Sequence, residues 1–427
     1  MKNILVSLFF CMAIFLSCSD IDSDNGKADL NAFSSLTNSL TRSQNEVANG
    51  QLNFGLNFFK RAYSSGCDNL LVSPFSVAVE LSMLTAGTTG KAYDELNRAL
   101  GFNDFSQEQI YDFYNVASSR LTEFSDGAFS IANAIWINAD GDFDKTIKDD
   151  FKQIVNDSYQ AEIAALVFNN KAVSLINEWA KNKTNGKIEK VIEMLAPTDK
   201  VVLNNAINFD GRWNYVYSVS NGTFTSEKGK KIEKPFFGGD DPFIHMWNLN
   251  NKLSKEPSIV GIPFSGNYTM YFFLPPEKQS LDDFINSIDA DRWVRWISQT
   301  YCKETKSRIV SFRIPFFDSG ESDKLVNCKS LLKSMSVSEI FNDPDFSPMT
   351  SSDLPLKVTS ISQNNRISVN EKGCNAASVS TVVVGMEISN YNQSEPERYS
   401  FIADRPFVYA IVENTTQTIL FMGTVTE

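Results

Sequence analysis

The spacing of apolar residues changes along the chain, from helical in the first half to strand-like in the second. The clearest helix is the segment SPFSVAVELSMLTAG, residues 73–87, which is apolar on nearly all sides. Ser73 can accept a hydrogen bond from the first turn, and Pro74 suits the first helical position, so this segment is predicted to be a buried helix. An amphipathic helix is expected before it, from apolar residues three to four positions apart: Leu52, Leu56, Phe59 and Tyr63.

Further helices are predicted over residues 88–102, 107–123 and 145–157. Segments with alternating or continuous apolar residues predict strands at 129–138, 159–168, 201–209, 261–275, 308–317 and 356–370. Residues 406–414 and 416–425 are predicted to form a closing hairpin. Helices concentrate in the first half and long antiparallel strands in the second, which predicts an α+β fold rather than a doubly wound parallel sheet.

Composition limits the possible functions. A chain of 427 residues with 42% hydrophobic content can bury a large core, and we expect one large domain over residues 46–427. The formal net charge of -12, with no cluster of Lys and Arg interleaved with aromatic residues, argues against nucleic-acid binding.

The N-terminus has the pattern of a signal peptide over residues 1–17: Lys2, an apolar stretch, and Ser17 before Cys18. The sequence FLSC at 15–18 resembles a bacterial lipobox, which implies cleavage before Cys18 and a lipid anchor on its sulfur. An ordinary secretory signal is the alternative. Residues 18–45 are predicted to be a flexible tether.

The acidic run SDIDSDNG, which follows Cys18, resembles a surface-export tag of some Gram-negative lipoproteins, although it is equally a solvated tether. We therefore expect a bacterial outer-membrane lipoprotein that is surface-exposed or faces the periplasm.

No catalytic constellation is present. The only histidine, His245, is expected to pack in the interior, and the usual nucleophile, phosphate-binding and zinc-protease motifs are absent. Ser330 and Lys333 match an SxxK spacing without its companion motifs, so they are interpreted as exposed helix residues. Four cysteines, Cys67, Cys302, Cys328 and Cys374, have no metal-ligand spacing, and their disulfide state cannot be inferred. We predict no enzyme activity, no metal and no cofactor.

The segment EKGCNAASVSTVVVGMEIS, 371–389, has no charge over 373–386 and is rich in valine, as is typical of a buried strand. It soon runs into a polar passage, which is typical of an exposed loop. Its period of two places small uncharged residues on both faces at its start. Such a segment could enter a sheet without burying a charge. The two faces are Cys374, Ala376, Ser378, Ser380, Val382 and Val384 against Asn375, Ala377, Val379, Thr381 and Val383.

Seven sequence runs in order over residues 50–427 resemble the serpins, a family of serine protease inhibitors. They are NLLVSPFSVAVELSMLTAGTTG with DELNRALGF, INEWAKNKTNGKI, LNNAINFDGRW, IPFSGNYTMYFFLP, DFSPMT, VNEKG and DRPFVYAIVENTTQTILFMGTV. The resemblance implies helices packed on large, mostly antiparallel sheets, with an exposed reactive-centre loop over about 371–398. It also implies suicide inhibition, in which a protease cleaves the loop and the loop inserts into the central sheet.

Residue roles follow from the resemblance. The hinge is Glu371, Lys372, Gly373, Cys374, Asn375, Ala376, Ala377 and Ser378, where the family usually has Thr or Ser in place of Cys374 and often Glu in place of Asn375. The family spacing places the reactive bond at Glu387-Ile388, which implies a Glu-specific serine protease as target. The alternative bond, Met386-Glu387, implies elastase-, subtilisin- or papain-like targets and thus includes cysteine proteases.

The resemblance also implies a region beneath the sheet where the strands part: Ser73, Ser76, Asn205, Gln363 and Trp213. Gln363 stands where the family usually has histidine, and its amide can both donate and accept hydrogen bonds. Residues 105–124 contain one arginine and several acids, so a heparin-type cofactor is not expected. We expect a monomer that contacts the membrane only through its lipid.

Two other functions remain open from the sequence. One is a non-inhibitory serpin that acts as a surface binding or structural module. The other, a surface glycan-binding lipoprotein, is disfavoured because the aromatic residues fall within strand patterns rather than in loops.

Overall fold

The computed structural model describes residues 40–427 apart from 67, 124, 127, 185, 187, 197, 250–254, 301–307, 321–325, 360 and 375–395. Its helices are α2 (Arg42–Tyr63), α3 (Pro74–Ala86), α4 (Gly90–Leu100), α5 (Gln107–Glu123), α6 (Asp149–Tyr159), α7 (Asn170–Lys183), α8 (Leu281–Ser287), α9 (Ala290–Thr300) and α10 (Cys328–Ser334), with 3-10 turns at Asp140–Thr146 and Glu339–Phe341.

Helix α2 begins at Arg42, within the range predicted to be a tether. A capping box explains this start: the Thr41 hydroxyl accepts a hydrogen bond from the Gln44 N–H (3.2 Å), and the Gln44 side chain accepts one from the Thr41 N–H (2.9 Å). The reciprocal bonds satisfy two backbone donors that a helix start otherwise leaves without partners.

Helix α3 confirms the prediction of a buried helix over 73–87. Every residue of α3 is buried, Pro74 occupies its first turn, and the Ser73 hydroxyl accepts a hydrogen bond from the Ser76 N–H (3.3 Å). The helix lies between α2, α4 and the strands β4 and β18, which explains why it is apolar on all sides.

The two largest sheets take nearly all their strands from the C-terminal half of the chain. A six-stranded antiparallel sheet contains the predicted closing hairpin at its centre, in the order β1 (Leu71–Val72), β18 (Ile419–Val425), β17 (Phe407–Glu413), β9 (Tyr268–Leu274), β8 (Ser258–Pro263), β7 (His245–Trp247). A four-stranded sheet has the order β16 (Glu397–Ile402), β10 (Arg308–Pro315), β6 (Lys231–Asp241), β5 (Ser218–Thr225). The α+β class predicted from the sequence is confirmed.

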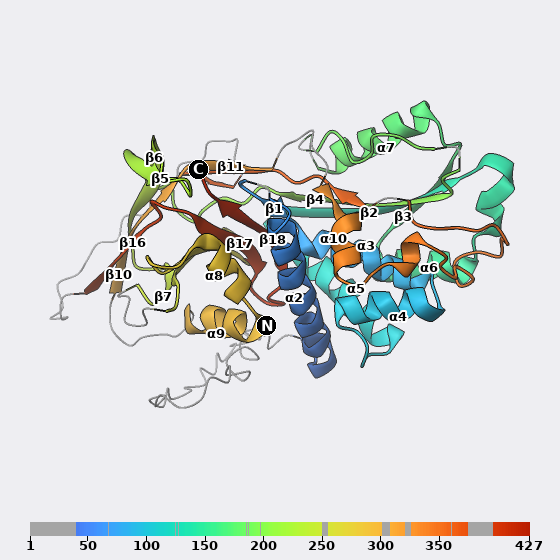
Figure 1. The fold of residues 1–427 in the computed structure, drawn as a ribbon, viewed down its shortest axis with the longest axis horizontal. Helices are drawn as coiled ribbons and strands as arrows, with labels where there is room; N and C mark the ends of the chain where they lie inside the picture. Colours follow the sequence, from blue (N-terminus) through green and yellow to red (C-terminus); the bar gives the residue numbers. More distant parts are fainter. Residues whose placement is uncertain are drawn as a thin grey trace, which may run out of the picture.

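A third sheet has the order β3 (Glu162–Leu166), β2 (Phe129–Asn138), β4 (Val201–Phe209). Figure 1 shows α7 on one side of this sheet and the helices α3 to α6 on the other. Helix α7 packs on β2 through a small hydrophobic core that is separate from the main one. Its members are Ala134, Trp136, Phe168, Ala172, Ile176, Ala180, Ile188 and Val191.

The segment 356–370, predicted as one long strand, forms strands only near its end. They are β13 (Ser362–Gln363), which pairs with β12 (Val326–Asn327), and β14 (Ile367–Asn370), which pairs with β11 (Phe317–Ser319) and β15 (Gly373–Cys374). Within the described residues, the segment shares no ladder with β4. The segment therefore has the sequence pattern of a strand but no partner strand among the described residues on the side of β4. Only the residues that pair with β11, β12 or β15 adopt regular strand structure.

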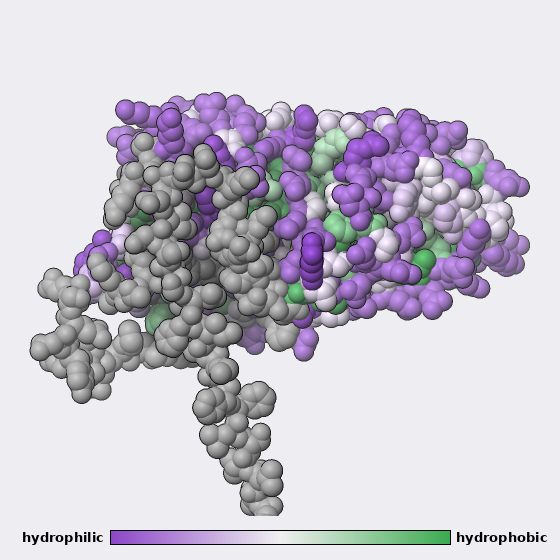
Figure 2. All heavy atoms as spheres, turned by 90° about the horizontal axis from the view of Figure 1, so that it is seen from below, coloured by the Kyte–Doolittle hydropathy of each residue, from purple (hydrophilic) through white to green (hydrophobic). Residues whose placement is uncertain are grey.

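Hydrophilic residues predominate on the described part of the face in Figure 2, with small apolar areas among them. Among the described residues, no helix has the length and apolar character that crossing a bilayer requires.

Candidate functional site

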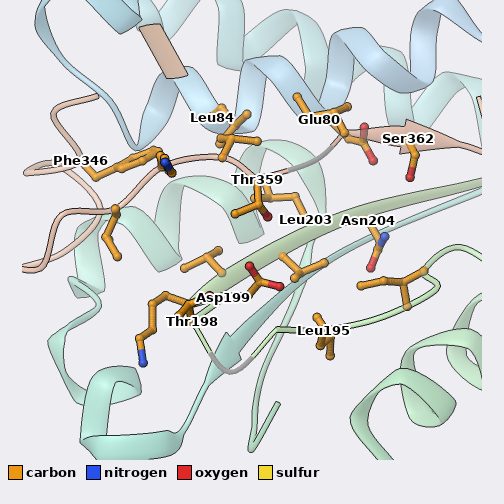
Figure 3. Close-up of a pocket in the computed structure, with 18 of the residues that line it drawn as sticks. Glu80, Leu84, Leu195, Thr198, Asp199, Leu203, Asn204, Phe346, Thr359 and Ser362 are labelled. Atoms are coloured by element: carbon orange, nitrogen blue, oxygen red, sulfur yellow. The ribbon is translucent and has the colours of Figure 1, made fainter. Parts of the chain in front are cut away.

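A cavity of about 220 Å³ lies between β4 and the segment 355–362. Figure 3 shows Asn204 of β4 and Thr359 of the facing segment on its walls, and Glu80 of α3 at one end. Most of the residues that line it are of apolar type: Leu84, Val191, Ile192, Met194, Leu195, Val201, Val202, Leu203, Phe346, Met349, Pro355, Leu356, Val358 and Ile361.

The strands on either side of this cavity belong to different sheets. In the ranges that the structure describes, β4 pairs only with β2, and β14 pairs only with β11 and β15. Neighbouring strands in a sheet lie about 4.8 Å apart, and a sheet edge without a neighbour can accept another strand. The arrangement therefore has a place for one more strand between β4 and the segment 355–370.

The two residues of β15 already occupy one end of this place. Gly373 and Cys374 pair antiparallel with Asn370 and Val369 of β14. On the other side, the Cys374 N–H donates to the Gly211 carbonyl (2.8 Å), just beyond the end of β4. The hinge thus enters between the two edges, and the Cys374 side chain is fully buried.

Only glycine fits at position 373. Its φ of 149° lies in the region that other residues rarely adopt, and a Cβ there would lie 2.1 Å from the Gly211 carbonyl oxygen. The sequence predicted this glycine as a bending point. The structure adds that it allows close approach of two backbones.

The turn before β15 is held by Trp213. The Trp213 indole N–H donates to the Asn370 carbonyl (2.9 Å), and its backbone N–H donates to the Lys372 carbonyl (3.0 Å). The ring stacks on Phe264, with centroids 4.3 Å apart and planes 13° apart. The Tyr217 backbone N–H donates a further hydrogen bond to the Glu371 carbonyl (3.1 Å). Trp213 therefore lies at the entrance to the strand position.

Beneath β4, side chains connect α3 to the sheet. The Ser76 hydroxyl donates to the Asn205 side-chain oxygen (2.5 Å), and the Asn205 side-chain amide donates to Asn133 of β2 (2.6 Å). The Asn205 backbone N–H donates to a Glu80 carboxyl oxygen (3.0 Å). Ser76 and Asn205 are thus joined directly.

Ser73 and Gln363 form a second connection, to the opposite strand. The Gln363 side-chain oxygen accepts from the Ser73 N–H (2.7 Å) and from the Asn365 side-chain amide. Its side-chain nitrogen contacts the Cys328 sulfur (3.7 Å). The Ser73 hydroxyl donates to the Leu420 carbonyl (2.7 Å). Because the Ser76 N–H also donates to the Ser73 hydroxyl, Ser73, Ser76, Asn205 and Gln363 form one hydrogen-bonded network. Trp213 bonds elsewhere, to the turn before β15.

Glu80 is the site residue that the sequence analysis missed. Its side chain is buried, and burial raises its pKa to about 8, although the Asn205 N–H acts in the opposite direction. Burial also raises the pKa of the neighbouring Cys328 thiol to about 12, with a smaller contribution from Glu80. The available signal was the single acid in the otherwise uncharged helix 73–87.

Several predicted residues lie outside the described ranges. They are Cys18, Asn375, Ala376, Ala377, Ser378, Met386, Glu387 and Ile388, with Cys67 and Cys302.

The remaining candidates for chemistry have ordinary surroundings. His245 is partly buried, and burial, with the nearby Arg308 charge, lowers its pKa to about 4, so it is neutral at physiological pH. Ser330 and Lys333 are both exposed on α10. Among the described residues, no group of three or more His, Cys, Asp or Glu side chains is placed to hold a metal ion.

Comparison with known proteins agrees with this geometry. The family described as Serpin (serine protease inhibitor) matches residues 49–427. Iripin-2 of Ixodes ricinus is 29% identical over 389 residues, which cover 87% of this chain and 91% of that protein. Serpin-ZX of Arabidopsis thaliana is 28% identical over 385 residues, covering 84% and 92%. The native structure of tengpin, a thermophilic serpin, superimposes with a TM-score of 0.74 at 26% identity, covering 89% of this chain and 94% of tengpin. A strand position with an entering hinge, together with a family match over nearly the whole described chain, identifies this protein as a member of the serpin family, whose members are generally protease inhibitors.

Proposed function

We propose that this serpin is a suicide inhibitor that traps its target protease by inserting the cleaved loop between β4 and the segment 355–370. The observation that carries the proposal is β15, which pairs with β14 on one side and with Gly211, just beyond the end of β4, on the other. A strand that continued from Cys374 would run into the cavity without burying a charged side chain, because 374–386 contains none.

In the proposed mechanism, the protease nucleophile bonds to the carbonyl carbon of Glu387, and the amine of Ile388 leaves with a proton. The freed loop then enters the sheet while the protease remains bonded to its end. About fourteen residues at roughly 3.3 Å each move the protease about 45 Å. Deacylation requires precise positioning of the catalytic groups, so distortion of the protease stops the reaction at the acyl-enzyme.

Incubation with a panel of proteases tests the proposal. We expect a complex stable in SDS with a Glu-specific serine protease, if Glu387-Ile388 is the reactive bond, and mass spectrometry of the released C-terminal peptide identifies that bond. Release after Met386 would instead favour elastase-, subtilisin- or papain-like targets. Cleavage without any complex would support the alternative, a non-inhibitory binding or structural module.

A pair of loop variants makes this test specific for insertion. The Cys374 side chain is buried, so the two-residue period of a strand directs Ala376 to the interior and Ala377 to solvent after insertion. Ala376→Arg should therefore convert the inhibitor into a substrate, whereas Ala377→Arg should retain complex formation. Equal effects of the two variants would contradict insertion in this register.

A change in melting temperature gives a second readout. Cleavage at residues 386–388 should raise the melting temperature of the wild-type protein strongly, because the inserted strand completes the sheet. The same cleavage in Ala376→Arg should leave it nearly unchanged. An unchanged melting temperature in the cleaved wild type would refute the proposed function.

We further propose that the protein is a bacterial lipoprotein, anchored through Cys18 after removal of residues 1–17 and exposed at the cell surface or to the periplasm. The FLSC sequence supports this proposal. Partition of the full-length protein into a detergent phase, lost in Cys18→Ser, would test the anchor. Protease accessibility on intact cells would distinguish the two membrane faces.

A further inference from the structure

The edge of β4 that faces the strand position is engaged at Asn205. Its backbone N–H donates to Glu80 of α3 (3.0 Å), and residues of an antiparallel strand alternate between donating to one side and to the other. A strand inserted beside β4 would need this N–H for one of its own carbonyl groups. Glu80 therefore occupies a hydrogen-bonding position that the loop must take over.

The surroundings of Glu80 offer its charge no partner. Among the described residues, Glu80 forms no ion pair, and its charge acts on the buried Cys328 thiol of α10. The other titratable groups lie along the cavity wall: Asp199 and Lys200 before β4, and Lys357 on the facing segment. Figure 3 shows the Glu80 carboxyl directed from α3 toward the space between β4 and the segment that carries Ser362.

Loop insertion makes the surroundings of the Glu80 carboxyl less favourable for its ionised form. Before insertion, an ionised Glu80 receives the Asn205 N–H, and a hydrogen bond to a charged acceptor is the stronger kind. After insertion, the N–H belongs to the new strand, and the strand covers the cavity beside the carboxyl. An ionised Glu80 would then lose both its donor and its access to the cavity, which is costly, whereas a protonated one would lose much less.

We propose that Glu80 is a positioning residue whose ionisation opposes loop insertion, so that the rate of insertion falls as the pH rises. This inference rests on the proposed inhibitory function and adds a pH dependence to it. The raised pKa of Glu80, about 8, places the change in the mildly alkaline range. If only the protonated form permits insertion, the rate should fall about tenfold between pH 7 and pH 9.

Strand uptake without a protease tests this proposal directly. An acetylated, amidated peptide with the sequence of residues 375–384, NAASVSTVVV, has no titratable group, so any pH dependence of its uptake belongs to the protein. Uptake of the fluorescently labelled peptide by the intact full chain would be timed between pH 6.5 and 9.5. The matched control is Glu80→Gln, which keeps an oxygen acceptor for the Asn205 N–H but cannot ionise.

The expected result is a decrease of about tenfold between pH 7 and pH 9 for the wild type and a flat profile for Glu80→Gln. Equal profiles for the two proteins would overturn the role of Glu80 while leaving the inhibitory function intact. If neither protein took up the peptide at any pH, and cleavage left the melting temperature unchanged, the inhibitory function and the role of Glu80 would both be refuted.

Hydrogen exchange in the unmodified protein gives a second measurement that does not require the variant to fold. We expect the protection factor of the Asn205 amide to rise between pH 7 and pH 9 relative to that of Ile207, two residues further along the same edge. A constant ratio would overturn the proposal.

Discussion

Replacement of Gly373 by alanine should separate the hinge from the end of β4. The new Cβ would lie 2.1 Å from the Gly211 carbonyl oxygen and 2.9 Å from the Arg212 Cα, both of which are backbone atoms that cannot rotate away. One of the two backbones must therefore move. The movement breaks the hydrogen bond from the Cys374 N–H to the Gly211 carbonyl, whose length is 2.8 Å.

The size of the effect has two parts. The φ of 149° costs an alanine roughly 1–2 kcal/mol. A buried backbone hydrogen bond that is broken without replacement costs about 1–3 kcal/mol more. Gly373→Ala should therefore lower the free energy of unfolding of the intact protein by about 2–5 kcal/mol.

Gly229→Ala is a matched control, because Gly229 also has a positive φ, 77°, but has nothing within 4 Å of its expected Cβ. Gly229→Ala should lower the free energy of unfolding only by the cost of placing an alanine at a positive φ. Urea unfolding followed by tryptophan fluorescence would measure both variants, and hydrogen exchange would follow the Cys374 amide. If the two variants are equally stable, the close contact at Gly373 does not limit the hinge, and our explanation of this glycine is wrong.

Three further predictions concern polar groups that are buried or partly buried. Asn205→Ala removes two side-chain hydrogen bonds and should lower the free energy of unfolding, measured by urea titration, by about 2–4 kcal/mol. The control Asn53→Ala, at an exposed asparagine, should have little effect. Equal losses of stability in the two variants would contradict the role of Asn205. The pKa of His245 is lowered to about 4 in the folded protein from an ordinary value of 6.5, so its contribution is present above pH 6.5 and is lost as the pH falls toward 4. Stability should decrease by up to about 3 kcal/mol over that range, and His245→Asn should remove this part of the slope; an unchanged slope would refute it. Cys328 is fully buried with a raised thiol pKa, so a disulfide reagent at pH 8 should label it only after unfolding, and rapid labelling of the native protein, assigned by peptide mapping, would be the contrary result.

Much of the fold could be predicted from the sequence where a single physical cause determines the structure. The apolar stretch at 73–87 has one stable environment, the interior, and the strands at 129–138 and 201–209 begin and end as their patterns predict. Strands β5 and β6 were not predicted, because polar residues, glycine and proline outnumber apolar residues in both, so no apolar alternation marks them.

The site was predictable only in part. Family resemblance pointed to Trp213, Asn205 and Gln363, and the structure places all three along the strand position. It could not supply their partners, because hydrogen bonds between residues more than a hundred positions apart depend on the assembled sheet. Glu80 was overlooked for the same reason. A single acid in an apolar helix indicates a role only when the strand that it contacts is known.

The packing of α7 on β2 affects the rate at which the proposed loop insertion can occur. Helix α7 and the segment after it rest on β2 through eight buried side chains, several of them alanines, while the main core lies on the far side of the sheet. Local opening free energy follows the amount of apolar contact, so this cover can detach while the rest of the molecule remains folded. Val191, Ile192, Met194, Leu195 and Thr198 of that segment line the cavity. If the protein traps a protease as we propose, the rate at which this cover detaches limits how quickly the loop can insert before the protease completes hydrolysis.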